Sequence, residues 1–232
     1  TEVAVPWAVL ARAGHEVTFA TETGAAATCD PVTLTGEGLP RFARSMKARA
    51  ENCALYFEMA ASPAFQKPLS WARVDVGAFD AFHFPGGHAP GMRPYLESER
   101  VQAIAAAAFQ ANKPVSAICH GVIPLVRAKG SDGRALLYGR RTTALTGGME
   151  NFAVSITRQA LGNHYRTYPQ SVEDEVRANL AKKSDFKTGP LFPRYATETK
   201  PDRGFVVRDG NYISARWPGD AWTLATAFCR MV

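Results

Sequence analysis

The sequence predicts an α/β fold in which a largely parallel sheet carries helices on both faces. Short apolar segments typical of strands alternate with helical segments along most of the 232 residues, and this alternation is characteristic of parallel sheets. Two of the strand segments, 79–84 and 114–118, are followed at once by glycine-containing turns. The length fits one compact domain, so a single domain spanning residues 1–232 is expected.

In the first half of the chain, each expected element has a local signal for its type or its end. The first helix stops at Ala-Gly-His, residues 13–15. The following residues alternate as strands do, and Ser98 caps an alanine-rich helix. The expected helices are 3–13, 41–61 and 98–110, and the expected strands are 15–20, 79–84 and 114–118.

The second half continues the alternation and includes a hairpin. Ser-Val-Glu-Asp at 171–174 resembles a capping box, and Asp-Gly-Asn at 209–211 is a turn between two short strands. Residues 183–203 form a long polar loop. The expected helices are 120–129, 150–161, 171–182 and 219–231, and the expected strands are 141–145, 205–208 and 212–215.

The composition argues against a nucleic-acid or membrane partner. The chain is 46% hydrophobic and 21% charged, which allows a sizeable core. No apolar run is long enough to cross a bilayer, and the first residues lack the pattern of a secretory signal. The net charge of +6 comes from scattered residues, which favours a solvated basic surface over a polyanion site. A mild preference for anionic small molecules is compatible with this charge.

The four cysteines indicate a reducing compartment, and hence a cytoplasmic location, rather than a disulfide framework. They lack the spacing of metal ligands. Cys53 and Cys229 fall on apolar helical patterns and are expected to be inert core thiols, whereas Cys29 lies in a loop. Cys119 differs from these three because it stands between a strand and a helix.

Cys119 is the leading candidate for a catalytic residue. In Ala-Ile-Cys-His-Gly at 117–121, an apolar strand ends, the cysteine occupies the turn and a helix begins, which is the cysteine counterpart of a nucleophile elbow. The positive end of the helix would stabilise a thiolate and lower the pKa of the thiol. The alternative is a buried structural cysteine.

The turn that contains Gly86, Gly87 and His88 ends a neighbouring strand. Its two glycines leave backbone N–H groups open to a ligand. Together with the N–H of His120, they would form an oxyanion hole over Cys119. The alternative is an ordinary strand-ending turn, in which His88 packs against the loop instead of contacting substrate.

These motifs, in this order, resemble the ThiJ/PfpI family of the class I glutamine amidotransferase-like superfamily, and within it the branch of glyoxalase III and heat-shock chaperones. Further segments similar to that branch are 2–6, 13–24 and 143–150. The resemblance covers nearly the whole chain and implies a flavodoxin-like three-layer sandwich. The family's first strand is expected upstream of Thr1, and the segments 42–71 and 182–203 depart from the family pattern.

The resemblance also implies roles for individual residues. Cys119 would be the nucleophile, His120 the general base, and Glu150 the acid that orients His120. Glu2 would lie beside the sulfur of Cys119 and be protonated, while Gly87 and His120 would supply oxyanion N–H groups. Without the resemblance, both acids would be interpreted as residues favoured by the dipole at a helix start.

Arg216 and the remaining histidines complete the set of candidates. Arg216 precedes the final helix, where it either contacts an anionic group or is a surface arginine stacked on Trp217. His15, His83 and His164 are too scattered in the sequence to suggest a metal site. Neither a metal nor another cofactor is therefore expected.

The implied function is that of an enzyme acting on small reactive carbonyls, similar to cofactor-independent glyoxalase III, which converts a 2-oxoaldehyde to a 2-hydroxy acid. Two alternatives stay open. One is hydrolysis of an amide or thioester by the same nucleophile. The other is a non-enzymatic stress chaperone or redox sensor in which Cys119 is oxidised reversibly. The family suggests a homodimer as the assembly.

Overall fold

A four-stranded sheet forms the centre of the molecule. The computed structural model describes all 232 residues, and the central strands follow the order β3-β4-β6-β5. β3, β4 and β6 run parallel, whereas β5 pairs antiparallel with β6 in the predicted hairpin. The strands are β3 (Phe82–Phe84), β4 (Val115–Ile118), β5 (Val206–Asp209) and β6 (Tyr212–Ala215).

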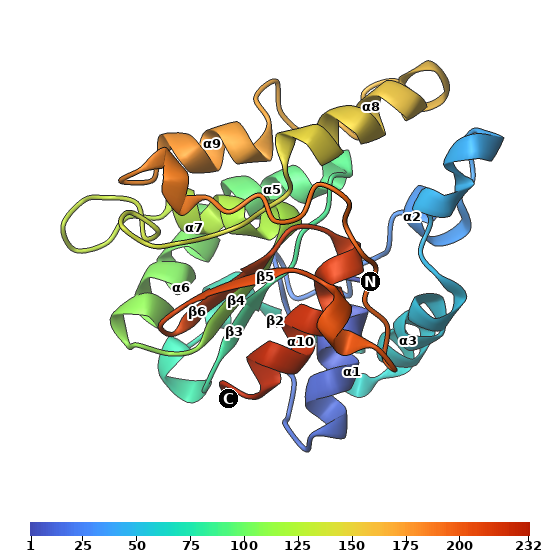
Figure 1. Ribbon diagram of the computed structural model, residues 1–232. Coiled ribbons are helices and arrows are strands. Elements are labelled where there is room, and N and C mark those ends of the chain that lie inside the picture. The colour runs from blue at the N-terminus through green and yellow to red at the C-terminus, as the bar shows by residue number, and fades with distance from the viewer.

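Helices cover both faces of this sheet (Figure 1). On one face lie α1 (Ala4–Arg12), α3 (Ala50–Ala61) and α10 (Ala221–Cys229), and on the other α5 (Arg93–Glu97), α6 (Glu99–Gln110), α7 (Ile123–Arg127) and α9 (Val172–Ala178). Successive side chains of β4 alternate between the two layers: Ala117 packs with α6 and α7, and Ile118 with α1 and α10. Every residue of β4 is buried, as expected for a strand covered on both faces. The predicted three-layer α/β arrangement is confirmed.

The remaining elements lie outside these layers. β1 (Ala20–Thr21) and β2 (Leu69–Ser70) form a separate parallel pair. The other helices are α2 (Pro31–Thr35), α4 (Pro63–Gln66) and α8 (Gly147–Leu161). Figure 1 shows α8 extending away from the sheet. Among all the helices, none combines the length and the apolar character that a membrane span requires.

Two predicted strands are largely absent. The strand predicted at 15–20 is reduced to β1, which begins only at its last residue. The strand predicted at 141–145 forms an isolated bridge and no ladder. There the backbone N–H of Thr143 donates to the side-chain hydroxyl of Ser214 in the neighbouring strand β6. Alternation of polar and apolar residues shows that a segment could lie as a strand on an apolar layer. It does not show that a partner strand is present to form the ladder.

Two predicted helices are interrupted. Residues 41–61 divide into a 3₁₀ segment, Arg41–Met46, and α3, because the backbone of Lys47 is extended. Residues 120–129 begin with a 3₁₀ turn and continue as the short α7, in which Pro124 has no N–H to donate. The second interruption affects the electrostatics of Cys119, as described below.

A buried ion pair joins the end of β6 to α10. Arg216 donates from Nε to Oδ2 of Asp220 at 2.8 Å and from an η nitrogen to Oδ1 at 3.1 Å, and both side chains are buried. The other η nitrogen donates to carbonyl oxygens in the loop 188–190, and the guanidinium lies over the ring of Phe205. Arg216 is therefore not a surface arginine stacked on Trp217. Its guanidinium is held by Asp220 and the loop 188–190, and its contact with an anionic group stays a prediction.

Removing one partner of this pair should strongly destabilise the protein. Asp220→Ala leaves the charge of Arg216 buried without a partner, so the free energy of unfolding should fall by about 3–5 kcal/mol. Glu198→Ala is the matched control, because Glu198 pairs with Arg12 at 2.8 Å on the surface and such pairs contribute about 1 kcal/mol or less. Urea denaturation measures both losses. Equal losses would show that the buried pair does not constrain the fold.

Candidate active site

Cys119 lies at the carboxyl end of the central strand in a backbone conformation that side chains rarely adopt. β4 ends at Ile118, and Cys119 has a φ of 58°, in the left-handed region. The chain then enters the 3₁₀ turn Cys119–Val122, which leads into α7. The predicted sharp turn between strand and helix is therefore present. Such backbone strain costs about 1–3 kcal/mol and is concentrated at functional sites.

Two glycines allow three chain segments to meet at this turn. A Cβ on Gly121 would lie 2.1 Å from the carbonyl oxygen of Phe84, the last residue of β3. A Cβ on Gly86 would lie 2.6 Å from Cβ of Cys119 and 2.7 Å from Oε2 of Glu2. Neither gap has room for a methyl group. Glycine is therefore required for the ends of β3 and β4 and for Glu2, near the start of α1, to approach this closely.

His120 bridges Cys119 and a threonine that has no recognisable signal in the sequence. Nδ1 of His120 is 3.5 Å from Sγ of Cys119, and its Nε2 is 3.1 Å from Oγ1 of Thr167. The Thr167 hydroxyl donates its proton to the carbonyl oxygen of His88 at 2.9 Å, so it accepts a hydrogen bond from Nε2–H of His120. The other nitrogen, Nδ1, then carries no proton and faces the thiol as an acceptor.

Glu150 does not contact His120, which corrects the orienting role that the family resemblance implied. Its carboxylate accepts hydrogen bonds from Arg166 at 3.2 Å and from the backbone N–H of Val172 at 3.0 Å. Glu150 therefore connects the start of α8 to the start of α9. Thr167 occupies the position beside His120 that was expected for the acid. Burial raises the pKa of the Glu150 carboxyl.

Glu2 is buried beside Cys119, and a histidine of β3 holds its backbone. His83 donates from Nε2 to the carbonyl oxygen of Glu2 at 2.8 Å, while its Nδ1 accepts from the hydroxyl of Ser116 at 2.7 Å. Burial raises the pKa of the Glu2 carboxyl to about 7, and its Oε1 has no hydrogen-bond partner. This carboxyl is therefore partly protonated at neutral pH, in the direction expected from the sequence.

The thiol of Cys119 and the carboxyl of Glu2 share one proton near neutral pH. Burial raises the pKa of Cys119 well above its usual range, and the charge of Glu2 raises it further. Because two adjacent negative charges repel, the pair loses its first proton near pH 7 and its second only at much higher pH. The remaining proton stays mainly on the sulfur, beside a carboxylate that can accept it.

This sharing replaces the predicted cause of thiolate formation. The helix expected at 120–129 was predicted to lower the pKa of the thiol through its dipole. The structure has a four-residue 3₁₀ turn there instead, which aligns few peptide dipoles. Burial outweighs their effect, so a thiolate can form only when the carboxylate of Glu2 takes the proton of the thiol.

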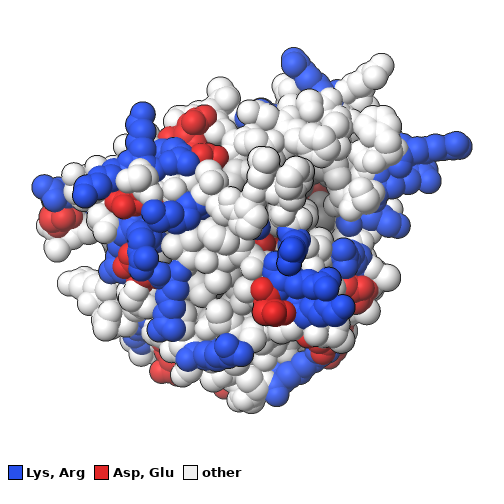
Figure 2. Space-filling model, in the orientation of Figure 1, with Lys and Arg blue, Asp and Glu red and all other residues white.

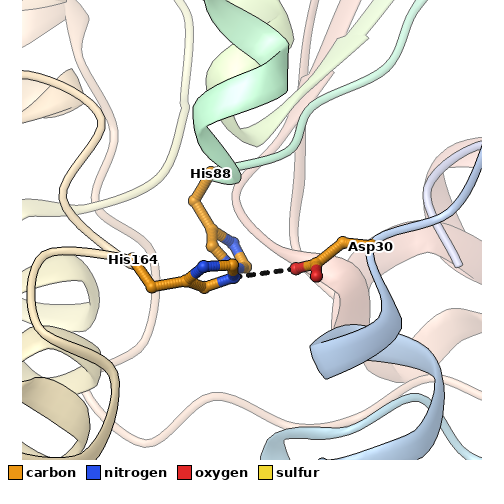
Figure 3. A group of neighbouring side chains, drawn as sticks. All are labelled: Asp30, His88 and His164. Carbon is orange, nitrogen blue, oxygen red and sulfur yellow. Dashed lines mark hydrogen bonds and ion pairs between the residues drawn. The ribbon is translucent and has the colours of Figure 1, made fainter.

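A second group of polar side chains lies close to this site. His88 stacks on Tyr165 with ring centroids 4.0 Å apart, and Nε2 of His164 is 2.9 Å from Oδ2 of Asp30. Figure 3 shows both imidazoles beside the carboxylate. The three groups offer ligand atoms that all lie within 4.8 Å of one another. His88 and His164, which are far apart in the sequence, are therefore neighbours in the fold.

Basic side chains do not form one continuous band on the face that Figure 2 shows. Lys and Arg occur there in separate groups with Asp and Glu among them, in agreement with the predicted solvated basic surface. One surface hollow is lined by Arg49, Arg194 and Arg203 together with Tyr195 and Thr197. A hollow lined by three arginines is compatible with a mild preference for small anions.

Known proteins resemble the chain in sequence and in fold. The model of a family described as ThiJ/PfpI family-like matches residues 1–190. Over 164 residues, or 71% of this chain and 69% of the relative, the chain is 38% identical to a deglycase of Pyrococcus horikoshii. It is 27% identical to a glutathione-independent glyoxalase of Schizosaccharomyces pombe, over 62% of this chain and 56% of that protein. The structure of glyoxalase III from Candida albicans covers 99% of this chain and 86% of its own, with a TM-score of 0.67 at 21% identity, which supports the flavodoxin-like fold.

The hydrogen bond between His120 and Thr167 should control both the tautomer of the imidazole and the reactivity of the thiol. Thr167→Val keeps the side-chain shape but removes the acceptor for Nε2–H. One such hydrogen bond contributes about 0.5–1.5 kcal/mol, so alkylation of Cys119 by iodoacetamide should slow by roughly two- to tenfold. Thr167→Ser should retain the wild-type rate. Nitrogen-15 NMR reports the tautomer, and an unchanged tautomer and rate in Thr167→Val would remove Thr167 from the site.

Proposed function

The chain belongs to the ThiJ/PfpI family, and on this basis we propose that it converts a small 2-oxoaldehyde to a 2-hydroxy acid without a cofactor, with Cys119 as nucleophile. The observation that carries this proposal is the group of Cys119, Glu2 and His120 at the carboxyl end of β4. Ligands of open parallel sheets bind at this end of the strands. Relatives named as deglycase and glyoxalase support a role with reactive carbonyl compounds.

The first step is addition of Cys119 to the aldehyde. The carboxylate of Glu2 takes the proton of the thiol as the sulfur forms a bond to the aldehyde carbon and the C=O π bond opens. The carboxyl of Glu2 gives its proton to the oxygen, and a neutral hemithioacetal results. Backbone N–H groups of Gly87 and His120 would stabilise negative charge on that oxygen during the addition.

The second step moves a hydrogen from one carbon to the next. Glu2, now a carboxylate, takes the proton from the hemithioacetal carbon to give an enediolate. A proton passes between the two oxygens, and Glu2 returns its proton to the adjacent carbon, which yields a thioester of the 2-hydroxy acid. The pKa of about 7 suits Glu2 to both tasks. Burial lowers the pKa of His120 to about 3, so its imidazole is a weak base and we assign it to positioning the thiol.

Hydrolysis completes the cycle. Water adds to the acyl carbon of the thioester, and the carbon–sulfur bond breaks, which releases the 2-hydroxy acid and restores the thiol. One 2-oxoaldehyde and one water give one 2-hydroxy acid. The aldehyde carbon is oxidised and the ketone carbon is reduced within the same molecule, so the reaction consumes no external oxidant or reductant.

A hydrolase is the second candidate. Several relatives are named as deglycases, at 26%, 28% and 38% identity. In this alternative, the same thiolate attacks an adduct between a carbonyl compound and an amine, and water releases the product. Because both candidates use Cys119, substrates of both classes belong in one assay.

Cys119→Ser should abolish turnover, because a buried serine hydroxyl has no comparable ionised form at neutral pH. Methylglyoxal in heavy water, without added thiol, is the test substrate. Exchange of the carboxyl proton of Glu2 with solvent at the enediolate stage should place deuterium on C2 of the lactate product, which proton NMR detects. Cys29→Ser is the control, since Cys29 lies in a loop and is only partly buried.

An active Cys119→Ser variant would contradict the nucleophile. Turnover of a carbonyl–amine adduct but not of methylglyoxal, lost in the same variant, would favour the hydrolase over the glyoxalase-like reaction.

The ionisation of Glu2 should determine how kcat/KM rises with pH on the acidic side of the profile. Below pH 7 both members of the pair are protonated, so kcat/KM should rise as the pH passes through about 7. In Glu2→Gln the ionisation near pH 7 is lost, so kcat/KM should no longer rise there. Removing the charge of Glu2 also removes one cause of the raised pKa of Cys119, so alkylation of Cys119 should shift toward lower pH. Glu16→Gln, at an exposed position, is the control, and an unchanged profile in Glu2→Gln would show that Glu2 is only a residue at a helix start.

A further inference from the structure

We propose that Asp30, His88 and His164 bind one divalent transition-metal ion of the Zn²⁺ type. This site is separate from the chemistry proposed for Cys119 and does not depend on it. Asp30 lies in the loop before α2, His88 in the loop after β3, and His164 in the loop between α8 and α9. A bound ion would join three loops that are far apart in the sequence.

The donor set has the composition that such ions prefer. Two imidazole nitrogens and one carboxylate oxygen are ligands typical of Zn²⁺ and Fe²⁺. Their ligand atoms lie within 4.8 Å of one another, and Figure 3 shows that they converge. One pair of donors, Nε2 of His164 and Oδ2 of Asp30, is 2.9 Å apart. Side-chain rotations would bring all three donors to the usual metal–ligand distance of about 2.0–2.2 Å.

His88 supplies an independent sign that a ligand is expected. Its Nε2 is buried and has no hydrogen-bond partner, and leaving such a group unpaired costs about 1–3 kcal/mol. The ring is held by its stack on Tyr165, and its centroid is 5.7 Å from that of His164. A metal ion between the three side chains would give this nitrogen the partner that it lacks.

The carboxylate of Asp30 is already oriented for coordination. Its Oδ1 accepts from the backbone N–H of Val32 at 3.0 Å, and its Oδ2 accepts from the hydroxyl of Thr33 at 3.2 Å. Such outer hydrogen bonds fix the direction of a metal ligand and are a regular part of metal sites. The contact of Oδ2 with Nε2 of His164 would be replaced by coordination of both atoms to the ion.

The position of the site indicates what the ion would do. The carbonyl oxygen of His88 accepts the hydrogen bond from Thr167, which in turn holds His120. Thr167 belongs to the same loop as His164. No proposed ligand is among the groups bonded to the sulfur of Cys119. We therefore assign the ion a structural role: it would fix the loops around the pocket and take no part in the reaction steps.

Titration of the chelator-treated, full-length protein with Co²⁺ tests the proposal. One equivalent should bind, with visible d–d bands and without the near-ultraviolet charge-transfer band of a cobalt–thiolate bond. Saturating Zn²⁺ should displace the Co²⁺ and raise the melting temperature. His164→Gln should weaken binding by at least about tenfold, because loss of even an outer partner of a ligand typically costs about 10–100-fold.

Asp30→Asn is the second variant, since asparagine caps α2 as well as aspartate does and the protein should fold without a charged ligand at this position. It should also lose at least about tenfold in affinity, whereas His15→Gln, outside the cluster, should bind like the wild type. Absence of saturable binding, a thiolate band, or equal affinity in wild type, His164→Gln and Asp30→Asn would overturn the proposal. Each result is independent of turnover by Cys119.

Discussion

The contact between Gly121 and the end of β3 is the constraint on which the site depends. The hydrogen of this glycine faces the carbonyl oxygen of Phe84, at a distance where no Cβ fits. Because the turn after β4 can sit this close to β3, Cys119 reaches the loop that contains Gly86, and Glu2 reaches both. The strained φ of Cys119 is maintained by the buried strand before it and the packed turn after it. A larger residue at either glycine would separate the thiol from its carboxyl neighbour.

Burial then decides the chemistry of the side chains that this constraint brings together. Desolvation raises the pKa of Glu2 and Cys119 and lowers that of His120, because each charged form is disfavoured away from water. The carboxyl is left with a pKa close to neutrality, so it is the group best matched to proton transfer. The imidazole stays neutral and acts through the direction of its hydrogen bonds. The same environment would protect a covalent intermediate from premature contact with water.

Local signals in the sequence predicted local structure well. The caps at Ser98 and Ser171 are confirmed, because their hydroxyls accept hydrogen bonds from the backbone, and so are the hairpin and the turn at Cys119. At the site, the failures concern contacts between distant segments. Glu150 had the position in sequence expected of an orienting acid, but the loop that follows α8 places Thr167 beside His120 instead. His88 and His164 were considered separately because no pattern along the chain connects two loops that meet only in the folded protein.

A crystal structure of the protein after brief exposure to a 2-oxoaldehyde tests the central claim most directly. The account predicts continuous electron density from Sγ of Cys119 to a carbon of the substrate, with the carboxyl of Glu2 within hydrogen-bond distance of the adduct and His120 still bonded to Thr167. An unmodified Cys119 in crystals that have demonstrably turned over the substrate would contradict it, as would an adduct on another residue.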